Sequence, residues 1–312
     1  MLVKISDDSL PKSEAMVISK IPAMGLFATE ILPESVEMFT ITYHGQDKRI
    51  GDTITIPFEP SKCQLASLER IHIDMYHSTC FAYDMGARYN DWFSERFGFK
   101  VVLAFWGENP RPVLGNIPGK PATYYPTEPN SLVRLIRSIP MLKDIIPKDT
   151  GIAFNDMAPY LVINETSVSD VTARLDRPMD ATKFRPNIII SGSSTVYEED
   201  FWAELVFNPS LPTKSCKMQL TANCTRCASL NVDYNEGKFA EGVEGEVLKK
   251  LMKDRRVDKG MKWNPVFGRY GFLEKAGEGK ILRVGDEVIV SKRNEERTTF
   301  GKCVSRLREM VY

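Results

Sequence analysis

Hydrophobic and polar residues alternate through much of the first hundred positions of the chain. Short β-branched or aromatic runs there are separated by Gly, Pro and Asp, as is typical of strands joined by turns. The pattern predicts strands in four segments: MVISKI (16–21), VEMFTITYH (36–44), DTITIPF (52–58) and RIHIDMY (70–76). We expect these segments to build a small β-rich unit.

In the segment ARYNDWFSERFG (87–98), the hydrophobic residues recur at the spacing of a helix instead of a strand. Four aromatic residues recur there at helical spacing: Tyr89, Trp92, Phe93 and Phe97. Such a stripe usually docks a helix onto the core, so we interpret it as packing rather than as a ligand site. The following segment, KVVLAFWG (100–107), predicts a buried strand.

The second half of the chain predicts short strands with Gly turns and few helices. The strand candidates are PYLVINE (159–165), NIIISG (187–192), ASLNVD (228–233) and LRVGDEVIVSK (282–292). One helix is expected in SVSDVTARL (167–175), which opens with a Ser-x-x-Asp sequence similar to a capping box. Its Val168, Val171 and Leu175 share one helical face. We therefore expect a barrel-like β lobe and a fold that is mainly β with some α, of the α+β class.

Residues 115–150 differ from both halves because they are Pro-rich and irregular. We interpret them as an insert between a first lobe at 1–114 and a second lobe at 151–312. An amphipathic segment of the insert is broken by Pro140 and carries three cations: Arg134, Arg137 and Lys143. A solvated face accounts for these cations better than a membrane surface or an acidic partner.

Composition and charge argue against several classes of function for this chain. Of the 312 residues, 43% are apolar and 26% are charged, which is ordinary for a globular protein. Lys plus Arg equal Asp plus Glu at 41 each, so no overall field attracts nucleic acid or anionic lipid. No apolar run is long enough to span a membrane and no secretory signal is evident. We expect an intracellular protein, cytoplasmic or associated with mitochondria and not secreted, whose six cysteines are thiols.

Two of these cysteines, Cys224 and Cys227, form a C-x-x-C pair. The spacing fits half a zinc site, a redox dithiol, a disulfide or a single functional thiol. Zinc is disfavoured because there is no second pair and the three histidines have no zinc-finger arrangement. A dithiol should open a helix, whereas the segment after Cys227 predicts an extended chain. This leaves a metal-binding thiolate at Cys227, favoured by the neighbouring Arg226, or two small buried side chains.

Two further segments predict strands that are mainly apolar, yet each contains polar residues that could bind a ligand. In FRPNIIISG (184–192), Arg185 offers forked donors to phosphate or carboxylate, and Asn187 offers donor and acceptor groups. The alternative is a surface ion pair for Arg185 and a turn cap for Asn187. In VFGRYGFL (266–273), two glycines permit close backbone approach, and Tyr270 either binds a ligand or fills the barrel mouth.

Taken in order, these segments resemble the MOSC domain. The resemblance rests on F-R-P-N, the acidic stretch YEEDFWAEL (197–205), C-x-R-C, F-G-x-Y and L-R-V-G-D, and it covers positions 151–290. MOSC domains form the C-terminal part of molybdenum cofactor sulfurases and the body of amidoxime-reducing components. The resemblance implies a MOSC-type β-barrel lobe, and the first lobe is similar to the N-terminal barrel of those proteins.

The resemblance also implies a molybdenum cofactor (Mo-molybdopterin) and residues that hold it. Cys227 matches the cysteine that binds molybdenum. The residues that match contacts to the pterin or to its phosphate end are Arg185, Asn187, Thr225, Arg226 and Tyr270. Asp156, Met157 and Ala158 align with a further segment that contacts the cofactor, although Met and Ala replace polar residues there.

The implied activity is that of a molybdenum-dependent oxidoreductase that reduces small N-hydroxylated, amidoxime-type substrates. A b-type cytochrome and a flavin-dependent reductase are the implied electron donors, since the chain has no nucleotide fingerprint of its own. The family's opening Lys-Ser strand and its Asp-Arg-x-Trp sequence are not found, so we expect the first lobe to be incomplete at its start. A non-catalytic cofactor carrier stays open as an alternative. So does a sulfur-handling MOSC domain, although no pyridoxal-phosphate domain, which sulfurases carry, is recognisable.

Overall fold

The computed structural model describes residues 1–6, 13–31, 37–45, 53–75, 78–107, 110–113, 116–119 and 151–300. The chain divides into two compact units. The barrel unit comprises Met1–Arg111 and Cys227–Val247, and the sheet unit comprises Pro112–Arg226 and Leu248–Tyr312. The predicted insert, with its Arg134, Arg137 and Lys143, lies outside the described residues except for positions 116–119.

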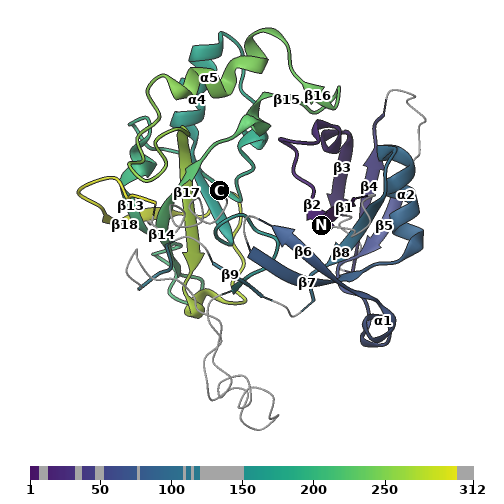
Figure 1. Ribbon diagram of the computed structural model, residues 1–312. Coiled ribbons are helices and arrows are strands. Elements are labelled where there is room, and N and C mark those ends of the chain that lie inside the picture. The colour runs from purple at the N-terminus through teal and green to yellow at the C-terminus, as the bar shows by residue number, and fades with distance from the viewer. Residues whose placement is uncertain are drawn as a thin grey trace. The chain divides into compact units, whose positions relative to one another are not determined.

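The barrel unit is built on five strands that close into a barrel (Figure 1). In barrel order they are β1 (Leu2–Ile5), β2 (Ser13–Ala15), β6 (Arg70–Met75), β7 (Ser78–Asp84) and β8 (Val101–Phe105). Three more strands form an antiparallel sheet: β3 (Phe27–Ile31), β4 (Met38–Tyr43) and β5 (Thr53–Pro57). Strands β4, β5 and β6 confirm three of the four predictions from alternation.

The fourth predicted strand, MVISKI at 16–21, is wrong. Strand β2 ends at Ala15, and the backbone N–H groups of Lys20 and Ile21 both donate to the Val17 carbonyl, at 2.9 and 3.0 Å. A 3-10 helix, η1 (Pro22–Leu26), follows at once. Proline has no N–H to donate to a strand ladder and its φ is fixed, so the chain turns here instead of extending.

The aromatic stripe belongs to helix α2 (Ala87–Phe97), as predicted, and the helix ends at Gly98 with a φ of 73°. Phe93 is fully buried, and the other aromatic residues of the stripe pack against the same core cluster. The rings of Phe97 and Phe27 stack with centroids 4.6 Å apart. The buried strand β8 comes next in the chain. The stripe is therefore core, and its helix is docked by aromatic packing.

The remaining elements of the barrel unit are short. Helix α1 (Lys62–Ser67) begins with a capping box at Ser61. The segment after Cys227 contains η4 (Ala228–Asn231), β15 (Val232–Asp233), β16 (Lys238–Phe239) and η5 (Gly242–Glu246), and α5 (Val247–Met252) begins where the unit ends. None of the described helices combines the length and the apolar character needed to span a membrane.

The sheet unit is organised around six strands. Their order across the sheet is β12 (Ile188–Ile190), β11 (Tyr160–Asn164), β17 (Val266–Leu273), β14 (Cys216–Thr225), β13 (Trp202–Phe207) and β18 (Val288–Arg293). Only the pairing of β11 with β12 is parallel. Trp202, Leu205 and Met218 are buried at the centre of its core. The fold is mainly β with some α, which confirms the predicted class.

Short elements complete the sheet unit. They are β10 (Gly151–Ile152) and the 3-10 helices η2 (Ala181–Phe184), η3 (Glu198–Phe201) and η6 (Lys275–Gly277). Strand β9 (Arg111–Pro112) lies where the first segment of the barrel unit ends.

Helix α4 (Glu165–Leu175) begins two residues before the predicted start, so the capping box expected at Ser167 is wrong. The cap is Asn164, whose side chain accepts a hydrogen bond of 3.1 Å from the Thr166 N–H. Asn is as good an N-cap as Ser, and strand β11 delivers it directly to the helix start. Ser167 is buried inside the helix and donates to Glu199 Oε2 at 2.8 Å. The predicted apolar face of Val168, Val171 and Leu175 is buried, as expected.

Candidate functional site

The end of strand β14 presents the cysteine segment. Its pairing with β17 shifts register between Asn223 and Thr225, which marks an irregularity of the bulge type. Bulges re-aim side chains and are frequent beside functional sites. After the strand, the Arg226 N–H donates to the Pro265 carbonyl at 2.8 Å. This bond holds Arg226 beside the start of β17.

A polar cluster forms around Cys224, which is 2% exposed, and reaches the surface at Asp156. The Arg226 guanidinium donates to Cys224 Sγ and to the Phe184 carbonyl, both at 2.9 Å. The Tyr270 hydroxyl donates to Asp156 Oδ2 at 2.6 Å. Burial raises the pKa of the Cys224 thiol, and the positive charge of Arg226 opposes that rise.

The same cluster determines the state of Tyr270. Burial raises the pKa of its phenol well above the usual value, and Cys224 and Asp156 reinforce the shift. The phenol therefore keeps its proton at neutral pH. The structure thus brings Tyr270, Asp156 and Arg226 together, three of the residues that the family resemblance singled out.

The expectation that the Arg226 side chain lies against Cys227 is wrong, because its guanidinium contacts Cys224 instead. Side chains two residues apart in an extended chain lie on the same face, and side chains three apart lie on opposite faces. Arg226 therefore shares a face with Cys224, although Cys227 is its neighbour in sequence.

Cys227 is exposed, in contrast to Cys224. It is the first residue of the second segment of the barrel unit and the N-cap of η4, with φ −123° and ψ −175°. The extended conformation predicted for ASLNVD is therefore wrong at 228–231, because Leu230 is buried and its N–H returns to the Cys227 carbonyl at 3.4 Å. Cys227 Sγ lies 3.2 Å from the Ser229 hydroxyl oxygen. Sequence reasoning missed Ser229, for which the only signal was a hydroxyl two residues after the cysteine.

Arg185 follows η2 in a left-handed conformation with a φ of 55°. Its side chain is exposed and makes no hydrogen bond or ion pair to any residue that the structure describes, so the alternative of a surface ion pair finds no partner there. The preceding residue, Phe184, supplies the carbonyl that accepts from Arg226. The two arginines of the predicted site are thus joined through one backbone group.

The other predicted site residues differ in their exposure. Asn187 is exposed, and its Oδ1 accepts from the Leu161 N–H at 2.8 Å, which ties it to strand β11. Met157 and Thr225 are half-buried, and Ala158 is buried. All three belong to the sheet unit.

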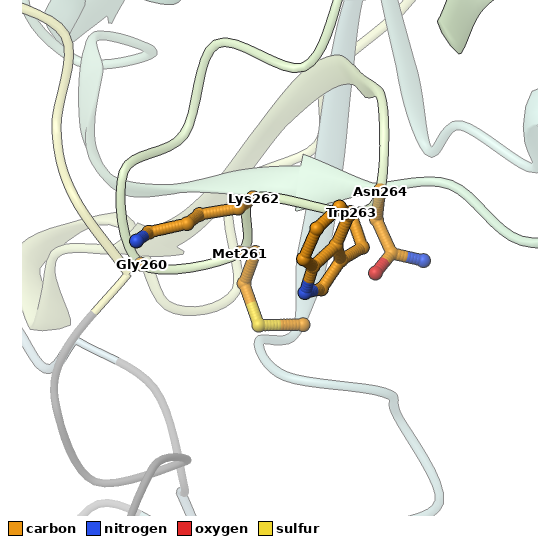
Figure 2. Close-up of a pocket in the computed structure, with 5 residues that line it drawn as sticks. All are labelled: Gly260, Met261, Lys262, Trp263 and Asn264. Atoms are coloured by element: carbon orange, nitrogen blue, oxygen red, sulfur yellow. The ribbon is translucent and has the colours of Figure 1, made fainter.

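A loop that sequence reasoning missed lies between α5 and β17. Residues Gly260, Met261, Lys262, Trp263 and Asn264 line a pocket of about 250 Å³ (Figure 2). The Asn264 side chain donates to the Arg226 carbonyl at 3.4 Å. The single exposed tryptophan in GMKWN was the available signal, but an exposed aromatic cannot be told from a buried one by sequence alone.

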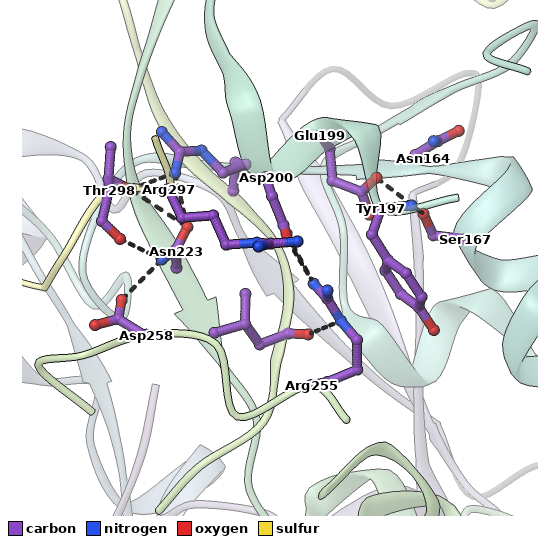
Figure 3. A network of polar contacts seen from close by, with 12 residues as sticks. Asn164, Ser167, Tyr197, Glu199, Asp200, Asn223, Arg255, Asp258, Arg297 and Thr298 are labelled. Atoms are coloured by element: carbon purple, nitrogen blue, oxygen red, sulfur yellow. Dashed lines mark hydrogen bonds and ion pairs between the residues drawn. The ribbon is translucent and has the colours of Figure 1, made fainter. Parts of the chain in front are cut away.

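Figure 3 shows a network of charged and polar groups, most of them buried, that includes Asn223 of strand β14. Asp200 is fully buried and accepts from Arg255 and from Arg297, each at 2.7 Å. The Asn223 side chain donates to Asp258 Oδ2 at 2.8 Å and to the Thr298 carbonyl at 2.7 Å. The network therefore connects Arg297 and Thr298, near the end of the described residues, to Asn223, the strand residue that precedes Cys224.

Comparison with known proteins identifies the domain class of the second half of the chain. The model of the MOSC domain matches residues 149–289, so the chain carries a MOSC domain at those positions. MOSC domains are associated with molybdenum cofactor binding.

The chain is also similar to curated relatives from several animals. It is 34% identical over 166 residues to human mitochondrial amidoxime-reducing component 1, which covers 53% of this chain and 43% of the relative. It is 34% identical over 155 residues to the mouse protein of the same name (49% and 43%), and 31% identical over 144 residues to bovine mitochondrial amidoxime reducing component 2 (46% and 40%). The matches thus span less than half the length of each of these relatives.

Proposed function

We propose that this chain is a molybdenum-cofactor-binding oxidoreductase that reduces N-hydroxylated substrates of the amidoxime type. The MOSC domain and the names of the relatives support the class of activity. The observation that carries the proposal is the difference between the two cysteines. Cys227 presents an exposed thiol, whereas Cys224 is buried and engaged by Arg226.

The donor groups fit such a cofactor. A soft metal selects thiolate ligands, and Cys227 offers one that is accessible. A phosphate suits the forked donors of arginine, and the exposed Arg185 side chain has no partner among the described residues. In this proposal Cys227 holds the metal, and Arg185 and Asn187 hold the phosphate end and the pterin. The further pterin contacts are Thr225, Arg226, Tyr270, Asp156, Met157 and Ala158.

When bound, the cofactor would supply the two-electron chemistry that cleaves an N–O bond. Reduction of an amidoxime to an amidine takes up two electrons and two protons and releases water. The electrons come from a partner, which we propose to be a b-type cytochrome supplied by a flavin-dependent reductase, and the setting is mitochondrial-associated or cytoplasmic.

The protein's own contribution is positioning. The Arg226 guanidinium is fixed at two of its nitrogens by Cys224 and the Phe184 carbonyl. The Tyr270 phenol keeps its proton and directs it to Asp156. These contacts hold the strand end in one conformation, so that the residue after Arg226 is delivered in a defined place.

The test compares two single substitutions of chemically equivalent residues. Cys227→Ser is expected to lose molybdenum and to abolish benzamidoxime reduction in a reconstituted electron chain, with an unchanged circular dichroism spectrum. Cys224→Ser is expected to keep most of both. Equal loss in the two variants, together with loss of zinc or a changed thiol–disulfide titration, would show that the cysteines work as a pair. Molybdenum in the wild-type protein without turnover would indicate a cofactor carrier instead.

A further inference from the structure

The side chain of Ser229 lies against the exposed thiol of Cys227. Its hydroxyl oxygen is 3.2 Å from Cys227 Sγ, which is within hydrogen-bond range for sulfur. Ser229 is 6% exposed, so its hydroxyl has little access to water. Among the residues that the structure describes, Cys227 is the only hydrogen-bond partner of this hydroxyl. Because buried hydroxyls are nearly always hydrogen-bonded, the sulfur fills a requirement of Ser229 that no other described group meets.

The chain around Ser229 is fixed by burial and by backbone hydrogen bonds. Ser229 belongs to η4, where the Leu230 N–H donates to the Cys227 carbonyl at 3.4 Å and the Val232 N–H donates to the Ser229 carbonyl. Leu230 and Val232 are both fully buried. Ser229 and Cys227 lie in the same segment of the barrel unit. A short turn within one unit therefore directs the hydroxyl at the sulfur.

Cys227 Sγ has no competing donor among the described residues. Although Cys227 is the N-cap of η4, its side chain accepts no hydrogen bond from the helix backbone. Cys224 differs, because the Arg226 guanidinium donates to its sulfur. The contact with Ser229 occupies one lone pair of Cys227 Sγ and leaves the others for a metal.

The charge of the sulfur decides which of the two atoms donates. A thiolate carries no proton, so the hydroxyl is the donor when Cys227 binds a metal. A hydrogen bond donated to a ligand atom fixes the orientation of that ligand and is one of the means by which proteins tune a metal site. It also withdraws charge from the sulfur, so the sulfur donates less to the metal and the reduction potential rises.

We propose that Ser229 is a positioning residue for Cys227: its hydroxyl donates to the thiolate, fixes the orientation of Sγ and raises the reduction potential of the bound metal. This inference rests on the proposed function, in which Cys227 holds the metal. Loss of the hydroxyl should therefore weaken metal retention and lower the potential, while the fold is kept.

The first test uses the full chain without its cofactor, produced in a host that cannot make molybdopterin. The probe is iodoacetamide, and mass spectrometry follows alkylation of Cys227 at a pH where the thiol is fully ionised. Ser229→Ala is expected to raise this limiting rate about threefold, because a thiolate without the hydrogen bond is a stronger nucleophile. Ser229→Thr should keep the wild-type rate, and Ser229→Val, which has the shape of threonine but no hydroxyl, should follow alanine. Equal rates in all four proteins would overturn the proposal.

The second test measures molybdenum content and the midpoint potential of the loaded protein. Ser229→Ala is expected to bind the metal about tenfold more weakly and to have a lower potential, and Ser229→Thr should restore both. Ser94→Ala is the matched control in the barrel unit, since the Ser94 hydroxyl bonds to the backbone of Val101. It should keep the wild-type metal content and potential.

The two tests separate this inference from the proposed function. Faster alkylation of Ser229→Ala, in a protein whose wild type never holds molybdenum, would refute the proposed function and leave the hydrogen bond to the thiolate standing. Molybdenum that is lost in Cys227→Ser, but held at the wild-type content and potential in Ser229→Ala, would refute the positioning role alone.

Discussion

Arg226 connects three segments of the sheet unit through its side chain and its backbone. Its guanidinium contacts Cys224 and the carbonyl of Phe184, and its two peptide groups contact the loop before β17. Cys224 thus has a clear structural use as an acceptor for Arg226, which explains how a C-x-R-C sequence can contain only one exposed thiol. The second cysteine, Cys227, is the exposed one, and its role as a metal ligand stays a prediction.

Arg185 is the residue whose substitution tests the anion site. Arg185→Ala is expected to weaken cofactor retention, because each charge-assisted hydrogen bond contributes about 1.5–3 kcal/mol. Arg185→Lys should restore retention only in part, since an ammonium group lacks the planar fork. Backbone strain at the φ of 55° is similar in both variants, because Ala and Lys each carry a Cβ atom.

The measurement is the molybdenum and pterin content of each purified Arg185 variant. Full retention with lysine would contradict bidentate binding. Wild-type content in both variants would remove Arg185 from the site.

At the scale of elements, strand β17 depends on Gly268, the glycine of the F-G-x-Y sequence. Gly268 has a φ of 83°, and an added Cβ atom would lie 2.8 Å from both Ile163 Cγ2 and the Val162 carbonyl oxygen. The residue therefore needs the conformational freedom of glycine and also the absence of a side chain where β17 approaches β11.

Gly268→Ala is expected to lower the free energy of unfolding by about 2–5 kcal/mol, the sum of backbone strain and overpacking. Gly285→Ala is the control, because Gly285 also has a positive φ, 92°, but has nothing within 4 Å of an added Cβ atom. That variant should lose only the strain, about 1–2 kcal/mol. Urea denaturation checks both, and equal losses would show that crowding at Gly268 contributes nothing.

At the scale of the whole molecule, stability of the sheet unit depends on buried charges. Asp200→Asn leaves the Arg255 guanidinium, only 4% exposed, without its counter-charge. We expect a loss of about 3–5 kcal/mol in the free energy of unfolding. Lys20→Ala, which breaks an exposed pair with Glu14, should cost about 0–1 kcal/mol. A loss of similar size in both variants would mean that Asp200 is compensated by its surroundings.

Glu199 makes stability depend on pH. Burial raises the pKa of its carboxyl from 4.5 to about 7. Between these values the folded state holds a proton that the unfolded state releases. The contribution of Glu199 to the free energy of unfolding is therefore complete below pH 4.5 and is lost as pH rises through 7. The loss amounts to about 3 kcal/mol.

Glu199→Gln should remove this loss, so its stability relative to the wild type rises between pH 5 and pH 8. Glu198→Gln is the neighbouring control. The Ser193 hydroxyl and Arg293 lower the pKa of Glu198 from its usual value of 4.5, so its contribution is lost only as pH falls below that value, and Glu198→Gln should leave the slope between pH 5 and pH 8 unchanged. Unfolding free energies measured across this pH range decide the matter, and an unchanged pH slope in Glu199→Gln would contradict the raised pKa.

Local patterns in the sequence determined several of the elements and the resemblance to the MOSC domain. Alternation specified β4, β5 and β6, and the aromatic stripe specified α2, because strand and helix periods are read over neighbouring residues. The order of the motifs identified the MOSC domain that the comparison matched at residues 149–289. The lobe boundaries at 114 and 150 and the roles of the site residues stay predictions.

Only the tertiary structure decided which side chains meet. Arg226 faces Cys224 and not Cys227, since its partners include the carbonyl of a residue 42 positions away in the chain. The turn at 18–20, the 3-10 helix after Cys227 and the exposure of Trp263 likewise differ from, or were invisible to, the local pattern. Hydrogen bonds and burial depend on groups that are distant in sequence, so no window of neighbouring residues contains the information that determines them.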